Sequence, residues 1–285
     1  MGDPAFISLV VGLCWPALIT AAATIIGGML GRQSAWFPAF AGTWLAVGFL
    51  VSQQYAGTMQ FPPTTAGSWL ACGGVAVSLT AWLLLLPGWG RHVGRALCVL
   101  TFLALLLAQA KSKFLYAWQR EDVWIAVVAL LALSIATPLA FSRAAKIQGK
   151  WTTIVAYGLQ TALLAVALVA GSSASLATQA GALALAWAGF FLGCLVIHPD
   201  RPLAMITQGF LFTSLTLHGF WYADLKLTSM LLIILAPVTG GILAWILDKP
   251  EPSRWRRWVP AAASTIQVAI GTIVALAQST PSGYN

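Results

Sequence analysis

The chain has 285 residues, of which 59% are hydrophobic and only 8% are charged, and its mean hydropathy is +0.85. Soluble globular domains carry about a quarter charged residues, so this composition excludes an ordinary water-soluble protein. The net charge of +8 is therefore not a sign of nucleic-acid binding. We expect the chain to lie in a lipid bilayer.

Ten apolar stretches, separated by short polar connections, account for nearly all of the chain. The hydrocarbon core of a bilayer is about 30 Å thick and a helix rises about 1.5 Å per residue, so each stretch is long enough to span it. The sequence predicts an all-α, polytopic integral membrane protein, a bundle of about ten transmembrane helices in which residues 1–285 form a single transmembrane domain. The predicted helices are Phe6–Leu30, Ala35–Ser52, Gly67–Leu86, Val93–Ala110, Val123–Phe141, Thr152–Ala170, Ala180–Ile197, Leu203–Phe220, Leu227–Ile246 and Val259–Ala277.

The distribution of basic residues predicts the orientation of this bundle. Lys and Arg accumulate on the cytoplasmic side of membrane proteins, and the odd-numbered connections hold eleven of them against four in the even-numbered connections. We therefore expect both termini outside and the segments 143–150 and 248–258 in the cytoplasm. Asp3 stands where a signal peptide would carry Lys or Arg, and Phe6–Leu30 exceeds the apolar core of such a peptide, so we expect a retained first helix.

Glycine and proline indicate where helices pack or bend. Gly189 and Gly193 are four residues apart and share one helix face, which allows a neighbouring backbone to approach closely. They indicate either helix contacts within one subunit or a dimerisation motif. Pro237, followed by Gly240 and Gly241, predicts a bent or broken ninth helix, because proline removes a backbone donor.

Residues that could support catalysis or bind a metal are sparse. All seven carboxylates lie at the chain start or in connections, and the motifs of zinc proteases, serine hydrolases, P-loop proteins and dinucleotide-binding proteins are missing from the sequence. The four cysteines show no paired spacing. Because His92 and His198 fall in cytoplasmic connections and His218 near the outer face, no pair brackets a membrane haem. We expect no metal site and no cofactor, and an enzyme is the less favoured class.

One group of polar residues lies at the predicted outer side. Ser214, His218 and Tyr222 follow at steps of four, so they line one face of the eighth helix in its last turns. Four further candidates for a solute pathway lie at the same predicted level, at the outer ends of the second and fourth helices: Gln53, Gln54, Gln109 and Lys111. The basic connection Lys111–Arg120 is either an anion-attracting vestibule or a solvated loop at the lipid headgroups. His218 is either a pathway residue or a structural histidine near the interface.

Three function classes remain open on these grounds. The leading hypothesis is a multi-pass transporter or permease of the cell inner membrane that moves a small polar or amphipathic solute. The alternative is a non-catalytic, membrane-embedded subunit of a larger complex, which the lack of buried charge also fits. The third is a lipid-modifying membrane enzyme. The expected partners are the lipid bilayer, a small-molecule solute, and either other membrane proteins or further copies of this chain; nucleic acid is not expected.

Overall fold

The computed structural model describes residues 4–30, 41–55, 59–148, 150–196, 201–248 and 254–279. Within these ranges the regular structure is helical, which confirms the all-α prediction. The α-helices are α1 (Pro4–Leu30), α2 (Ala41–Tyr55), α3 (Ala66–Ala81), α4 (Trp89–Tyr116), α5 (Arg120–Ile147), α6 (Lys150–Ala170), α7 (Ala174–Val196), α8 (Arg201–Tyr222), α9 (Leu227–Ile246) and α10 (Arg254–Ser279), and the 3-10 helix η3 (Trp82–Leu85) extends α3.

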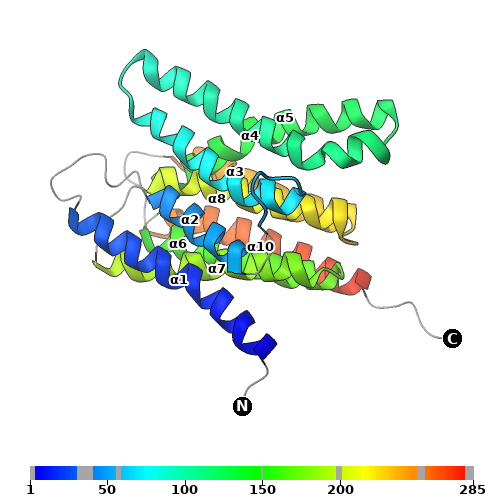
Figure 1. Cartoon of the computed structure of the whole chain (residues 1–285). Coiled ribbons are helices and arrows are strands. Elements are labelled where there is room, and N and C mark those ends of the chain that lie inside the picture. The colour runs from blue at the N-terminus through cyan, green and yellow to red at the C-terminus, as the bar shows by residue number, and fades with distance from the viewer. Residues whose placement is uncertain are drawn as a thin grey trace.

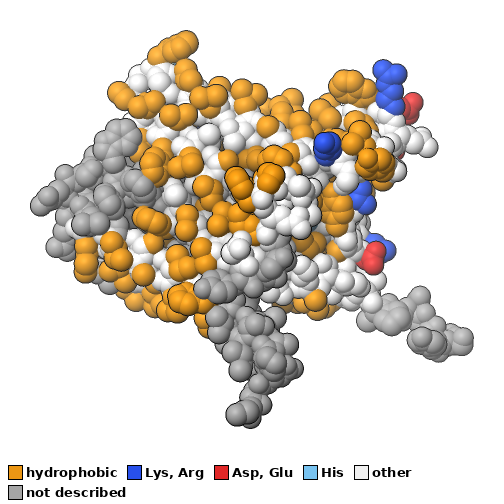
Figure 2. Space-filling view, in the orientation of Figure 1, with side chains coloured by type: hydrophobic (Ala, Val, Ile, Leu, Met, Phe, Trp, Pro, Cys, Tyr) orange, Lys and Arg blue, Asp and Glu red, His pale blue; other side chains and the backbone are white. Residues whose placement is uncertain are grey.

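Seven of the described helices are long and apolar enough to cross a membrane: α3 with η3, α4, α5, α6, α7, α9 and α10. Their outward faces carry large hydrophobic side chains such as Trp124, Val128 and Leu131 of α5. In the space-filling view, hydrophobic side chains cover the flank and charged ones gather at one end (Figure 2). The chain is therefore a multi-pass membrane protein by the length, composition and surface of its helices.

Successive helices run in opposite directions, so alternate connections meet at the same end of the bundle. At one end Arg143, near the end of α5, forms an ion pair with Asp248, which follows α9; the nitrogen and oxygen are 3.6 Å apart. At the other end Ser229 of α9 donates a hydrogen bond to the side chain of Gln278 in α10, 3.3 Å away. The start of α1 and the end of α10 point the same way (Figure 1).

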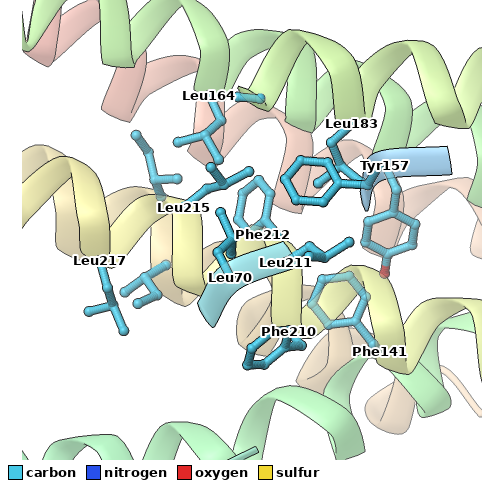
Figure 3. Close-up of a cluster of buried hydrophobic side chains, with 14 of the residues drawn as sticks. Leu70, Phe141, Tyr157, Leu164, Leu183, Phe210, Leu211, Phe212, Leu215 and Leu217 are labelled. Atoms are coloured by element: carbon cyan, nitrogen blue, oxygen red, sulfur yellow. The ribbon is translucent and has the colours of Figure 1, made fainter. Parts of the chain in front are cut away.

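The eighth helix is the centre of the bundle. Every residue from Ala204 to Gly219 is buried, and α8 contacts α2, α3, α4, α5, α6, α7 and α9. Figure 3 shows Phe210, Phe212 and Leu215 of α8 among hydrophobic side chains of the surrounding helices, with Phe141 of α5 near Tyr157 of α6. These last two rings stack with their centroids 4.8 Å apart. α8 thus faces protein rather than lipid over most of its length.

The glycine pair of α7 marks a close helix contact within the chain. A Cβ atom at Gly189 would collide with the backbone oxygen of Ala17 in α1, and one at Gly193 would lie 2.6 Å from the Cβ of Thr24. This confirms the first of the two readings, a contact between helices of one subunit. Helix α1 packs along α7 because these two positions have no side chain.

Of two further expectations from the sequence, the first is excluded in part, since only the break and not the bend is ruled out, and the second is wrong. Helix α9 is one continuous helix across Pro237, so it is not broken there; the buried Pro237, Gly240 and Gly241 lie in packed surroundings, with Gly241 against Ala140 of α5. The connection predicted from Lys111 to Arg120 shrinks to residues 117–119, because α4 continues to Tyr116 and α5 begins at Arg120. Lys111 and Lys113 therefore lie on a helix, where long basic side chains can reach past the apolar surface to the polar boundary.

Candidate functional site

Helix α8 is unusually polar for a helix at the centre of an apolar bundle. Outside this helix most buried positions are hydrophobic, and α8 is not among the seven apolar spans. A polar side chain enclosed by protein needs a hydrogen-bond partner, since burial removes the water that would otherwise supply one. The buried polar residues of α8 are Thr207, Gln208, Thr213, Ser214, Thr216 and His218.

Two polar side chains of α8, Gln208 and Thr216, have hydrogen-bond partners, whereas Thr213 Oγ1 has none among the described residues. The indole nitrogen of Trp187 in α7 donates to the side-chain oxygen of Gln208 over 2.6 Å, and the Gln208 amide nitrogen donates to the hydroxyl of Thr161 in α6 over 2.8 Å. Thr161 in turn donates to the backbone oxygen of Tyr157. Thr216 donates to the backbone oxygen of Phe212 within α8, at 2.8 Å. Gln208 thus joins α8 to α6 and α7.

The face of α8 opposite Thr216 carries polar groups without partners. Thr207, Ser214 and His218 are separated by seven and four residues, so they share one face of the helix. Thr207 and Ser214 are fully buried and His218 is 1% exposed. Within the described part of the chain, the Thr207 Oγ1, Ser214 Oγ and His218 Nε2 atoms have no hydrogen-bond partner. We call these three residues the unpaired stripe; it rises about 16 Å along α8 at about 1.5 Å per residue.

The stripe ends beside a polar junction between α8 and α4. The Tyr222 hydroxyl donates to the backbone oxygen of Gln109 over 2.8 Å and lies 2.8 Å from the hydroxyl of Ser112. The Tyr222 ring lies against the His218 ring, with centroids 5.6 Å apart, and Lys113 Nζ lies over the Tyr222 ring at 5.2 Å. Because Tyr222 is 43% exposed, it separates the buried His218 from the outside of the bundle.

Gln109 brings a fourth unpaired side chain to this junction. Its side chain is 1% exposed, and neither its amide oxygen nor its amide nitrogen has a partner among the described residues. An amide offers two donor hydrogens and an acceptor oxygen. Enclosing it unpaired in an apolar bundle costs about 1–3 kcal/mol. The α4–α8 junction therefore concentrates unsatisfied hydrogen-bonding capacity in one place.

The structure brings together three of the residues singled out from the sequence, and it places the others elsewhere. His218, Tyr222 and Gln109 meet at the junction, and Ser214 shares the face of His218. Gln53 is buried in α2, which packs against α8. Gln54 and Lys111 are exposed.

Sequence reasoning missed Thr207 and Ser112 as members of this site. Thr207 lies seven residues before Ser214, which is two turns of 3.6 residues, so the helical period rather than the step of four places it on the same face. Ser112 lies in the predicted connection Lys111–Arg120, for which the sequence predicts no helical spacing. Its contact with Tyr222 therefore does not follow from the sequence. Nothing in the sequence of α4 alone indicates that Ser112 contacts α8.

The site is polar but holds no acidic side chain among the described residues. The described carboxylates, Glu121, Asp122, Asp224 and Asp248, lie at helix ends or in connections. Across the described ranges no three His, Cys, Asp or Glu side chains are grouped to hold a metal ion. His92 is exposed in the first turn of α4, at the opposite end of that helix from Gln109, and His198 lies outside the described residues. The chemistry that the site can offer is neutral hydrogen bonding.

A second polar centre lies between α6 and α10. The amide nitrogen of Gln160 donates to the hydroxyls of Ser264 and Thr265, over 2.9 and 3.2 Å. Ser264 also donates to the backbone oxygen of Pro260 within α10, at 2.9 Å. Because these bonds connect two helices and use most of the available groups, this centre is suited to holding the bundle together.

No protein-family model, no curated protein and no solved structure matches this chain.

Proposed function

We propose that this protein is a permease that lets a small polar or amphipathic solute cross the membrane along the unpaired stripe of α8. The observation that carries the proposal is the row of buried groups without partners, Thr207, Ser214 and His218, which ends at Gln109 and Tyr222. A folded protein has little reason to keep such groups enclosed and unpaired unless water or a ligand completes their hydrogen bonds.

The placement of the site favours transport over catalysis. The stripe follows a helix that is surrounded by other helices, so a solute moving along it is shielded from the lipid. The groups along it bind by hydrogen bonds, and Ser214 Oγ and His218 Nε2, although one turn apart, do not form the hydrogen-bonded nucleophile–base pair that catalysis would need. A lipid-modifying enzyme would instead need reactive side chains near the headgroup level.

We also propose how the whole chain sits in the membrane. All ten helices cross it as one transmembrane domain, including α1, α2 and the polar α8, with both termini outside and the Arg143–Asp248 ion pair on the cytoplasmic side. The support is the excess of Lys and Arg in the odd-numbered connections. The tyrosine at the end of the stripe then faces the outside of a cell inner membrane.

The test is solute flux through the purified protein in lipid vesicles. We expect reconstituted vesicles to take up a small polar solute faster than protein-free vesicles, and His218→Ala to slow that uptake while the variant still purifies as a folded protein. His92→Ala, at an exposed position in the first turn of α4, is the matched control and is expected to keep the original rate. The readout is light scattering after rapid mixing with a concentrated solute.

Two results would contradict the proposal. If no solute enters faster than into protein-free vesicles and the chain co-purifies from its native membrane with fixed partners, it is a subunit of a complex. If His218→Ala leaves a measured flux unchanged, the solute does not pass the stripe, and His218 is a structural residue near the interface.

A further inference from the structure

We propose that the solute is uncharged and rich in hydroxyl or amide groups, and that this path rejects inorganic ions. The inference rests on the proposed function and specifies its substrate class. It follows from the kinds of unpaired atoms along the stripe and from their spacing.

The unpaired groups call for a partner that both donates and accepts hydrogen bonds. The hydroxyls of Thr207 and Ser214 can do either, the Gln109 amide offers two donor hydrogens and an acceptor oxygen, and the His218 imidazole adds Nε2. A hydroxyl group on a solute can donate to or accept from each of these groups in turn as the solute moves along the helix. A polyol or a small sugar-like molecule therefore matches the stripe chemically.

The spacing of the oxygen atoms does not suit a metal cation. Thr207 and Ser214 are seven residues apart on α8, which places them about 10 Å from each other along the helix axis. A hard cation needs about six oxygen ligands at 2–2.6 Å to replace its water shell. No described carboxylate lies on the stripe to offset the loss of that shell, so dehydrating a cation there would be costly.

Anions lack a compensating charge along the same face. Lys113 lies at the junction, and its Nζ lies over the ring of the outer residue Tyr222. An anion could approach the mouth of the path, but it would lose its hydration further in without meeting a positive side chain. The positions of the described charged side chains thus favour neutral solutes.

The experiment compares fluxes of neutral and charged probes through the same reconstituted vesicles. Erythritol and xylitol serve as neutral probes, followed by light scattering, while rubidium and chloride tracers serve as ions. We expect both polyols to enter faster than into protein-free vesicles, and both tracers to enter at the protein-free rate. Ion flux without polyol flux would overturn the inference and leave a permease. If none of the four probes moves through the protein, the inference fails together with the permease proposal for solutes of this size.

A matched pair of threonines tests whether hydrogen bonding along the stripe sets the rate. Thr207→Val removes an unpaired hydroxyl of the stripe, whereas Thr216→Val removes a hydroxyl on the opposite side of α8 that is bonded to Phe212. We expect Thr207→Val to slow xylitol flux by about five-fold, the factor that corresponds to one net hydrogen bond of about 1 kcal/mol. Thr216→Val is expected to keep the original flux. Equal effects of the two substitutions would show that the stripe does not contact the solute.

Discussion

Thr207 and Thr216 lie on the same buried helix, and their hydroxyls have different surroundings. Thr216 bonds to the backbone of its own helix, while Thr207 has no partner among the described residues. Nine residues separate them, which places them on opposite sides of α8. A buried hydroxyl without a partner in the protein costs free energy unless water or a solute forms hydrogen bonds with it. We expect this difference to appear in the free energy of unfolding of variants that lack a hydroxyl.

Thr207→Val should change the free energy of unfolding by less than about 1 kcal/mol, because its hydroxyl has no hydrogen bond to the described protein to lose. Thr161→Val is the control, since it leaves the amide of Gln208 without its acceptor and should lower the free energy of unfolding by about 1–3 kcal/mol. Denaturant titration of the detergent-solubilised variants, followed by tryptophan fluorescence, measures both. Destabilisation of similar size in the two variants would mean that Thr207 has a partner in the resting protein.

Part of the candidate site follows from the spacing of polar residues in the sequence of α8. The step-of-four spacing of Ser214, His218 and Tyr222 was sufficient to place them on one face, because helix geometry is fixed by residue number. Which helix meets that face depends on the packing of the whole bundle. The contact of Tyr222 with Ser112 joins residues 110 positions apart and could not be read from either helix alone.

At the scale of whole helices, the close approach of α1 to α7 depends on two glycines. Gly189 faces the backbone of Ala17, and Gly193 faces the side chain of Thr24. Backbone atoms cannot move aside as the end of a flexible side chain can. The first of the two positions is therefore the less tolerant of an added methyl group.

Gly189→Ala should lower the free energy of unfolding by about 1–3 kcal/mol, because the new Cβ would force α1 away from α7. Gly158→Ala in α6 is the matched control: its Cβ would lie 3.7 Å from the Cβ of Trp187, an ordinary contact. We expect this second variant to unfold like the original protein. Thermal unfolding in detergent compares the two, and an equal loss of stability in both would exclude a special role for the α1–α7 contact.

Helix positions were predictable to different degrees for physical reasons. Leu227–Ile246 is predicted with both ends correct, since the charged residues Lys226 and Asp248 lie just outside a stretch that has no charged residue. Val93–Ala110 was too short at both ends, because α4 carries its amphipathic first turn and its last turns with Lys111 and Lys113 beyond the apolar stretch. Hydropathy reports the lipid-facing part of a helix, while the helix itself continues wherever its backbone bonds remain satisfied.

Across the whole molecule, the central position of α8 could not be inferred from its composition alone. A helix that faces lipid must be apolar on its lipid-facing side, whereas one enclosed by seven others can carry polar side chains all round. The same composition would also fit a helix outside the membrane. Only the packing of the surrounding helices distinguishes these cases, and packing depends on contacts between distant parts of the chain.

The proposed orientation makes a prediction for the chain as a whole. A reporter that is active only outside the cytoplasm, fused after Asn285, should be active, and one fused within the segment 143–150 should be inactive. The physical reason is that Lys and Arg are retained on the cytoplasmic side. Impermeant labelling of a cysteine introduced near Tyr284 in intact cells is an independent check. Activity of the reporter only at the segment 143–150 would reverse the orientation and move the α4–α8 junction to the cytoplasmic side.

The most direct test of the central claim, a polar solute path along one face of α8, is the water accessibility of that face in the membrane. Single cysteines are introduced at Thr207, Ser214 and Thr216 in a protein whose native cysteines, Cys14, Cys72, Cys98 and Cys194, are replaced by alanine. A small water-soluble thiol reagent is then applied to membranes that contain each variant. We expect fast labelling at positions 207 and 214 and protection at position 216, where the threonine hydroxyl is hydrogen-bonded on the opposite side of the helix. Equal protection at all three positions would exclude a solute path along this face of α8, because a face closed to water cannot conduct a polar solute.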